Sequence, residues 1–244
     1  MNDPSTTELV TVAAIGDLHV TETCHNRYRA LFEEISEAAD VLALAGDLTN
    51  FGKVAEAEIL AEDLRACTIP VVAVLGNHDY EAGNAGEVAR ILEQAGATML
   101  GEQAVVLEGV GFAGTKGFIG GFGRGELGAF GEDAIKTFVG EALEEARILE
   151  NALRSLRTER SVAVLHYAPV ADTVQGEPLE IYPFLGCSRL ADAIDRFENV
   201  TAVVHGHAHR GRYQGRTPRG TPVYNCAIMV AEAELNRPYA LIEV

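Results

Sequence analysis

Acidic, amide and imidazole side chains recur along this chain directly after short apolar runs. The set comprises Asp17, His19, Asp47, Asn77, His78, Asp79, His166, His207 and His209. Five apolar runs each end at one or more of these polar residues. The loops at the carboxyl ends of parallel strands converge on one crevice of an open α/β sheet. We therefore expect these side chains to meet in space.

The mixture of donor atoms is typical of a transition-metal site. Carboxylates supply anionic oxygen, imidazoles supply neutral nitrogen, and Asn77 supplies a neutral carbonyl oxygen. This combination suits Mn²⁺, Fe or Zn²⁺ better than Ca²⁺, which prefers oxygen ligands alone. Asp17 and His19 are two residues apart, as are His207 and His209, so each pair shares one side of an extended segment.

Each motif taken alone also has a structural explanation. A single acidic or imidazole side chain at a strand end usually caps the chain or faces water. Gly46-Asp47 is by itself only a turn signal. The joint pattern, with every motif at the end of an apolar run, instead indicates a bound metal centre.

The elements that must position these residues alternate in the first half of the chain. Apolar and β-branched runs predict strands, and helical spacing of apolar residues predicts helices between them. The predicted strands are 9–15, 41–45 and 70–75, and the predicted helices are 27–39, 54–66 and 87–94. This alternation predicts parallel strands joined by right-handed crossovers.

The pattern changes after residue 100. A hairpin is predicted at 104–108 and 110–115, followed by a glycine-rich loop at 117–131 and a long helix at 132–157. Gly140 inside that helix indicates a bend, since glycine is a poor helix former. Further strands are predicted at 161–165, 200–204, 212–214, 222–226 and 239–244, with a short helix at 190–197.

Composition limits the classes of function. The 244 residues predict one domain spanning 1–244, and the formal net charge of −17 disfavours nonspecific nucleic-acid or anionic-membrane binding. No apolar run reaches the ~18 residues of a membrane span. The first ten residues carry no basic, apolar leader pattern, and the four cysteines form no CxxC pair. We therefore expect a cytoplasmic protein with reduced thiols.

The ordered motifs resemble those of the calcineurin-like metallophosphoesterase family, in particular its dimetal phosphodiesterases. The matching motifs are Asp17-Leu18-His19, Gly46-Asp47, Gly76-Asn77-His78-Asp79, His166 and Gly206-His207-Ala208-His209. The resemblance implies a four-layer αββα sandwich in which helices enclose two mixed β-sheets. It departs from many relatives at Tyr167, where a second histidine often follows the single one.

The resemblance also implies two divalent metal ions, with Mn²⁺ preferred and Fe or Zn²⁺ as alternatives. One ion would be held by Asp17, His19, Asp47 and His209. The other would be held by Asp47, Asn77, His166 and His207. Asp47 would then bridge the pair, because two cations ~3.5–4 Å apart need a shared negative charge.

The mechanism that the resemblance implies is attack on phosphorus by a metal-bridging hydroxide. His78 would act as general acid or transition-state stabiliser near the leaving oxygen. Asp79 would orient the His78 imidazole and keep it protonated. These assignments make His78 and Asp79 the expected catalytic residues.

A small intracellular phosphodiester is the expected substrate, with a cyclic nucleotide as one candidate. A phosphomonoesterase or protein phosphatase is the alternative, because it would share the same metal centre. A non-catalytic interaction module on the same fold is a further alternative, although such modules lose motif residues that are all present here. The sequence leaves the oligomeric state open.

Three residues are candidate substrate contacts. Arg124 lies in the glycine-rich loop 117–131, which is either a mobile lid or an ordered loop whose phenylalanines pack under the long helix. Tyr167 either faces substrate or packs in the core. His205 either supports the neighbouring ligands from the core or reaches the substrate.

Overall fold

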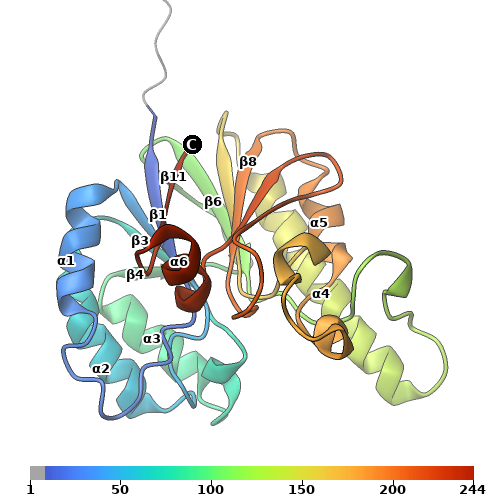
Figure 1. Ribbon diagram of the computed structural model, residues 1–244, viewed down its shortest axis with the longest axis horizontal. Helices are drawn as coiled ribbons and strands as arrows, with labels where there is room; N and C mark the ends of the chain where they lie inside the picture. The colour runs from blue at the N-terminus through green and yellow to red at the C-terminus, as the bar shows by residue number, and fades with distance from the viewer. Residues whose placement is uncertain (1–8) are drawn as a thin grey trace, which may run out of the picture.

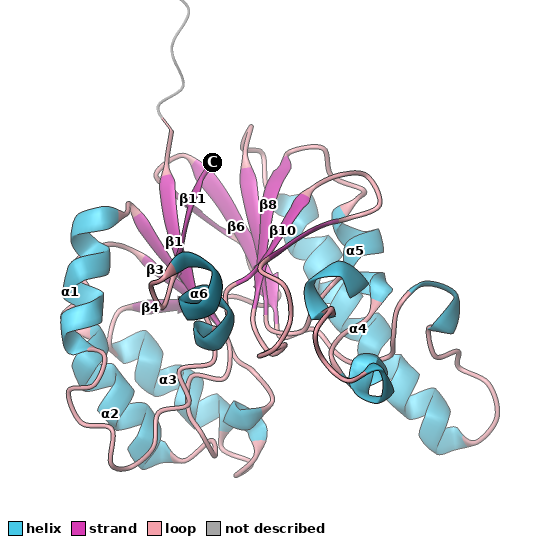
Figure 2. Ribbon diagram, viewed as in Figure 1, coloured by secondary structure: helices cyan, strands magenta, loops and turns pink. Residues whose placement is uncertain are grey.

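Two mixed β-sheets form the centre of the structure, a computed structural model that describes residues 9–244 (Figure 1). Helices cover the outer face of each sheet, so the layers run helix, sheet, sheet, helix (Figure 2). This confirms the predicted four-layer αββα sandwich. The first eight residues, which belong to the leader-pattern prediction, lie outside the described residues.

The first sheet is built from the first hundred residues and the end of the chain. Its order is β11-β1-β2-β3-β4, and only β11 runs antiparallel to its neighbour. The strands are β1 (Thr11–Ile15), β2 (Val41–Ala45), β3 (Val71–Val74), β4 (Ala97–Met99) and β11 (Ala240–Glu243). The connecting helices are α1 (Arg29–Ala38), α2 (Val54–Leu64) and α3 (Ala85–Gln94), and they share one outer face.

The second sheet has the order β5-β6-β7-β8-β10-β9, with a parallel centre and an antiparallel strand at each edge. The strands are β5 (Val105–Leu107), β6 (Val110–Thr115), β7 (Ser161–Leu165), β8 (Val200–His205), β9 (Gln214–Arg216) and β10 (Pro222–Asn225). The helices are α4 (Asp133–Ser155) and α5 (Ser188–Ile194) on its outer face, and α6 (Ile228–Leu235), which leads back to the first sheet.

The central strands are continuous apolar runs because both of their faces are covered. Alternate residues of one strand point to opposite faces of the sheet, and each face packs against another layer. In β1, Val12 and Ala14 face the second sheet, whereas Ala13 and Ile15 join the cluster under the helices. The strand β7 of the second sheet does the same, with Val162 facing the first sheet. A strand covered on both faces needs no polar side chain, which is typical of parallel sheets between helical layers.

Several boundaries differ from the sequence predictions. The strand predicted at 212–214 lies at 214–216, and α4 runs unbroken through Gly140, where a bend was predicted. The strand β4 and the helix α6 were not predicted. β4 has only three residues, and α6 has apolar residues on most of its circumference, so neither carries a clear period.

Two predictions made from composition concern the state of the cysteines and the presence of membrane-spanning segments. The structure describes Cys24, Cys67, Cys187 and Cys226 as free thiols, the last two buried. Across residues 9–244, no helix has both the length and the apolar character to cross a membrane.

His205, the last residue of β8, is fully buried. Its Nδ1 donates to the carbonyl of Gly206 at 2.7 Å, and its Nε2 accepts from Thr173 Oγ1 at 2.8 Å. Both ring nitrogens are therefore used inside the protein. The structure places His205 in the supporting position, and the alternative of a substrate contact is wrong because the side chain has no exposed surface.

Burial lowers the pKa of His205 from 6.5 to about 4. As the pH falls, His205 is therefore protonated in the unfolded chain before it is protonated in the folded protein. The free energy of unfolding, which is highest above pH 6.5, declines as the pH falls toward 4. Between pH 6.5 and 5 the loss from this residue is about 2 kcal/mol. We expect His205→Gln to flatten the acid side of the pH–stability curve, measured by urea unfolding in the presence of a chelator. His25→Gln, at an exposed position, is the control, and a slope unchanged in His205→Gln would contradict the assignment.

Candidate metal centre

The candidate ligands lie at the carboxyl ends of five strands. The chain enters β1 from above in Figure 1, so these ends lie at the lower edge of both sheets. Asp17 and Asp47 follow β1 and β2, and Asn77 follows β3. His166 follows β7, and His207 with His209 follows β8. The two sheets thus contribute donors to a single edge.

Four of these residues have the left-handed backbone conformation that usually favours glycine. The φ angles are 62° at Asp17, 45° at His19, 50° at Asp47 and 68° at His207. Such a conformation costs about 1–3 kcal/mol per residue and persists only where the surroundings enforce it. Their concentration at one edge indicates that backbone strain is used to aim these side chains.

Backbone hydrogen bonds hold the strained turns together. Asp17 N donates to Gly46 O at 2.9 Å, and His19 N donates to Asp47 O at 3.0 Å. His207 N, from the other sheet, donates to both carboxylate oxygens of Asp17 at 3.1 and 3.0 Å. The Asp17 carboxylate therefore joins the loops of the two sheets.

Two glycines are required because carboxylates pack directly against their α-carbons. A Cβ at Gly76 would lie 2.2 Å from Asp47 Oδ1, and one at Gly206 would lie 2.4 Å from Asp17 Oδ2. Both distances are far below van der Waals contact. The glycines of the GNHD and GHAH motifs are thus explained by close packing around the two acidic residues.

The donor atoms form three overlapping groups, each with its atoms within 4.8 Å of one another. The groups are Asp17 with His19 and His209, His19 with Asp47 and His78, and Asp47 with His166 and His207. His209 Nε2 lies 3.0 Å from Asp17 Oδ1, and His166 Nε2 lies 3.4 Å from Asp47 Oδ1. Asp47 belongs to two groups, so its carboxylate lies between two sets of imidazoles.

The hydrogen-bonding state of His166 fits a cation. Its Nδ1 lies 3.0 Å from the carbonyl of Ala45, which can only accept, so Nδ1 carries the proton. In the neutral ring, Nε2 then presents a lone pair toward Asn77 Oδ1 at 2.9 Å and toward Asp47 Oδ1. Three acceptor atoms converge here, and a bound cation would balance them.

His19 gives a second, independent indication. Both of its ring nitrogens are buried, and neither has a hydrogen-bond partner among residues 9–244. Its Nε2 lies 4.0 Å from Asp17 Oδ1 and 3.9 Å from Asp47 Oδ2. A buried polar atom without a partner is costly, and a metal ion between these groups would supply one.

The electrostatics of the cluster suit cation binding. Burial lowers the pKa of His19 to about 4 and that of His207 to about 3. Both imidazoles are then neutral at neutral pH, the form that binds metals. Burial raises the pKa of Asp47, and the neighbouring Asp17 carboxylate adds to this. A bound cation would offset this cost of ionisation.

His78 lies beside the cluster and remains open to solvent. Its Nδ1 is 2.7 Å from the carbonyl of Asn50, so that nitrogen carries the proton. Its Nε2 is 4.0 Å from Asp47 Oδ2, and 38% of the side chain is exposed. The imidazole is therefore fixed at one nitrogen and presents the other toward the centre.

Asp79 does not orient His78, and this expectation was wrong. Asp79 is fully buried, and its carboxylate accepts hydrogen bonds from Gly76 N at 2.8 Å, Leu48 N at 3.2 Å, Thr49 N at 2.8 Å and Thr49 Oγ1 at 2.6 Å. It therefore joins the loop after β2 to the loop after β3. Asn50 O takes the place next to the imidazole, a backbone contact that residue types do not reveal.

A cavity of about 550 Å³ opens beside the candidate ligands. It is lined by Asn77, Ile119, Tyr167, Glu177, Ile181, Phe184, Leu185, His207, His209 and Arg210. Tyr167 is largely buried, with its ring centroid 4.5 Å from that of His207, yet it also lines the cavity. Tyr167 therefore packs in the core as one alternative predicted, and its contact with substrate stays a prediction.

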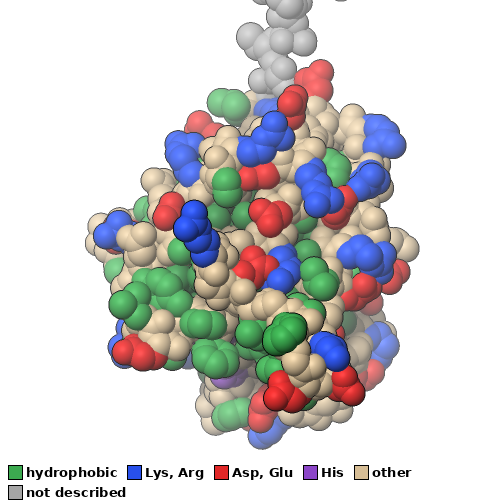
Figure 3. Space-filling model, turned by 90° about the vertical axis from the view of Figure 1, so that its right-hand side faces the viewer, with side chains coloured by type: hydrophobic (Ala, Val, Ile, Leu, Met, Phe, Trp, Pro, Cys, Tyr) green, Lys and Arg blue, Asp and Glu red, His purple; other side chains and the backbone are tan. Residues whose placement is uncertain are grey.

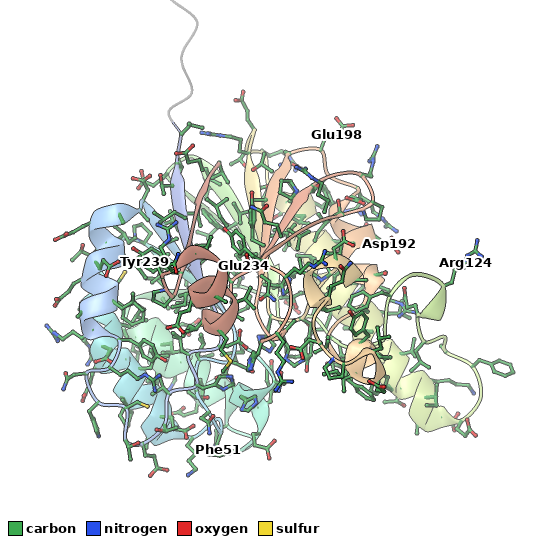
Figure 4. All side chains as sticks on the ribbon, in the orientation of Figure 1. Phe51, Arg124, Asp192, Glu198, Glu234 and Tyr239 are labelled. Carbon is green, nitrogen blue, oxygen red and sulfur yellow. The ribbon has the colours of Figure 1, made fainter. Side chains whose placement is uncertain are left out.

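Arg124 is not brought to the site. It lies in a short 3-10 turn of loop 117–131, and Figure 4 shows its side chain pointing outward at the margin of the molecule. In the same loop, Phe118 packs 5.1 Å from Phe138 of α4, as expected for an ordered loop, whereas Phe130 is 90% exposed. The expected contact of Arg124 with substrate is therefore wrong for this arrangement of the loop.

Sequence reasoning missed several lining residues. Arg210 directly follows the GHAH motif, and that adjacency could have identified it. Ile181 and Phe184 belong to the 3-10 segment η4 (Leu179–Phe184), which has no helical or strand period. Its position over the site depends on tertiary contacts alone.

Comparison with known proteins gives partial matches to two kinds of phosphoesterase. A symmetrical bis(5'-nucleosyl)-tetraphosphatase of Burkholderia mallei (strain ATCC 23344) is 43% identical over 67 residues, 27% of this chain and 22% of that protein. A probable glycerophosphodiester phosphodiesterase of Arcobacter nitrofigilis is 24% identical over 172 residues, 70% of this chain and 57% of that protein. The chain thus matches about a fifth of the tetraphosphatase and little over half of the diesterase.

Solved structures share the fold over nearly the whole chain. The phosphopantetheinyl hydrolase of Mycobacterium tuberculosis aligns with a TM-score of 0.66 at 17% identity, covering 96% of this chain and 95% of that one. A protein of Thermus thermophilus aligns with a TM-score of 0.59 at 17% identity, covering 97% and 99%. The family model described as calcineurin-like phosphoesterase matches residues 10–211. With its motif residues at one edge of the sandwich, the chain belongs to the calcineurin-like phosphoesterase family.

Proposed function

We propose that the chain is a dimetal phosphodiesterase that hydrolyses a small phosphodiester, with a cyclic nucleotide as one candidate. The observation that carries the proposal is the position of Asp47, whose carboxylate belongs to two groups of candidate ligands. The family supports phosphoester hydrolysis, and the partial match to a glycerophosphodiester phosphodiesterase favours a diester. A cytoplasmic location remains part of the proposal.

In this proposal Asp17, His19, Asp47 and His209 hold one ion, and Asp47, Asn77, His166 and His207 hold the other. Mn²⁺ is the preferred ion, because the donors mix carboxylate, amide oxygen and imidazole. The ions supply Lewis-acid polarisation of the phosphoryl oxygens and a water nucleophile at neutral pH. The residues supply a fixed set of lone pairs, since Ala45 O and Phe184 O fix the proton positions of His166 and His207.

His78 is the proposed general acid. With Nδ1–H donating to Asn50 O, a protonated ring offers Nε2–H to the departing ester oxygen. Its partial exposure lets the ring regain a proton from water after each turnover. Asp79 acts at a distance by holding the loops after β2 and β3, which carry Asn50 and His78.

The first test compares bis(p-nitrophenyl) phosphate with p-nitrophenyl phosphate, each with added Mn²⁺ and with EDTA. We expect EDTA-sensitive hydrolysis with a higher kcat/KM for the diester. Preference for the monoester would replace the diesterase proposal with a phosphomonoesterase. Absence of hydrolysis in protein shown to contain two ions would favour a non-catalytic interaction module.

Asp47→Ala should abolish binding of both ions, because it removes the one carboxylate common to both sets. The measurement is the metal content per chain by mass spectrometry after reloading and desalting. Asp133→Ala, which removes a fully exposed carboxylate on α4, is the control. Circular dichroism verifies folding, and two ions retained by Asp47→Ala would refute the bridging role.

His78→Ala should retain both ions and lose ~10²–10⁴ in kcat, the range expected for loss of a general acid. His25→Ala, at an exposed position, should keep the rate of the unmodified protein. Undiminished turnover in His78→Ala would remove His78 from the mechanism.

A further inference from the structure

The segment 176–186, which contains η4, is fixed at both ends to the loops that carry candidate ligands. A Cβ at Gly176 (φ 120°) would lie 2.1 Å from Arg210 O, and one at Gly186 would lie 1.9 Å from Ala168 O. Gly186 also pairs with Ala168 in an isolated β-bridge. The ends of the segment are therefore packed against the loops after β7 and β8, at a distance that only glycine permits.

The middle of this segment forms one wall of the cavity. Ile181, Phe184 and Leu185 line it together with His207 and His209. The Phe184 carbonyl also accepts from His207 Nε2 at 3.1 Å, so the wall is held next to a candidate metal ligand. Ile119, from loop 117–131, adds a further apolar side chain to the lining.

Leu185 is buried in a small apolar cluster, but packing within the chain does not explain the other two residues of the wall. Phe184 is 57% exposed and Ile181 is 37% exposed, and neither belongs to the apolar clusters among residues 9–244. Figure 3 views the molecule from the right-hand side of Figure 1 and shows hydrophobic side chains gathered near a histidine in the lower part of that view. Exposed large apolar side chains next to convergent polar groups are typical of a ligand site.

The wall shares its cavity with candidate metal ligands but not with the proposed general acid. The described lining includes Asn77, His207 and His209 but not His78. In the proposed function His78 faces the leaving oxygen, so the wall faces the ester group that stays on phosphorus. We infer that segment 176–186 is a specificity element that binds an apolar substituent on the retained side of the phosphodiester. This inference rests on the proposed function and specifies its substrate class.

The test uses two diesters with the same leaving group. Hydrolysis of p-nitrophenyl phenyl phosphate and p-nitrophenyl methyl phosphate breaks the same P–O bond, forms one to water, and releases p-nitrophenolate. Only the retained group differs. We expect kcat/KM to favour the phenyl ester, and the double variant Ile181→Ser/Phe184→Ser to reduce this preference about tenfold.

Leu179→Ser is the matched control. Leu179 belongs to the same 3-10 segment and is 74% exposed, but it is not among the described lining residues. We expect it to keep both rates and the preference. A preference unchanged in the double variant, or reduced equally by Leu179→Ser, would overturn the inference.

A binding measurement separates this inference from the proposed function. Calorimetry with the metal-loaded protein should give tighter binding of phenylphosphonate than of methylphosphonate, and the double variant should lose the difference. Such discrimination without turnover of either diester would refute the diesterase proposal and leave the apolar wall supported. Turnover of both diesters with equal affinities for the two phosphonates would overturn the inferred role of the wall and leave the diesterase proposal intact.

Discussion

Two carboxylates, Asp17 and Asp47, are buried close together where the edges of the two sheets meet. Burial of one carboxylate already opposes ionisation, and a second one nearby adds repulsion. The surrounding chain responds with backbone N–H donors, at His207 for Asp17 and at His78 for Asp47. The left-handed turns, the closely packed glycines and the surrounding imidazoles together hold these two carboxylates in one buried site.

Each sheet has its own residues that hold the candidate ligands in position through hydrogen bonds. Asp79 fixes the loops of the first sheet through four hydrogen bonds from Leu48, Thr49 and Gly76. In the second sheet, Thr173 and Gly206 hold His205 under the GHAH motif. The candidate ligands are thus held in part by partners that do not line the cavity. Such outer partners determine how accurately the donors are aimed.

The alternation of strands and helices in the first half, and the gathering of the candidate ligands at one sheet edge, could be predicted from short-range patterns. The four-layer sandwich was predicted from the family resemblance. Apolar runs such as 41–45 mark fully covered strands, and the polar residues that follow them must share one sheet edge. The contacts of the substrate side could not be predicted. Arg124, Phe184 and Arg210 lie in irregular segments, whose course depends on tertiary packing. Asp79 was misassigned because the hydrogen bond that orients His78 is made to the Asn50 backbone carbonyl, which every residue type possesses.

The hydrogen bond from His207 to Asp17 joins residues 190 positions apart in the chain. Contacts between residues this far apart form late in folding, because closing so long a loop costs conformational entropy that only later contacts offset. During synthesis, which runs from the N-terminus, the loops after β1 and β2 exist long before β8 leaves the ribosome. The strands β1 to β4 of the first sheet can therefore pair while Asp17 and Asp47 still face water, and β11 joins them only when the chain is complete. Assembly of the candidate ligand set must wait until nearly the whole chain has been made. Under the proposed function, binding of the metal ions would therefore be a late, post-translational step.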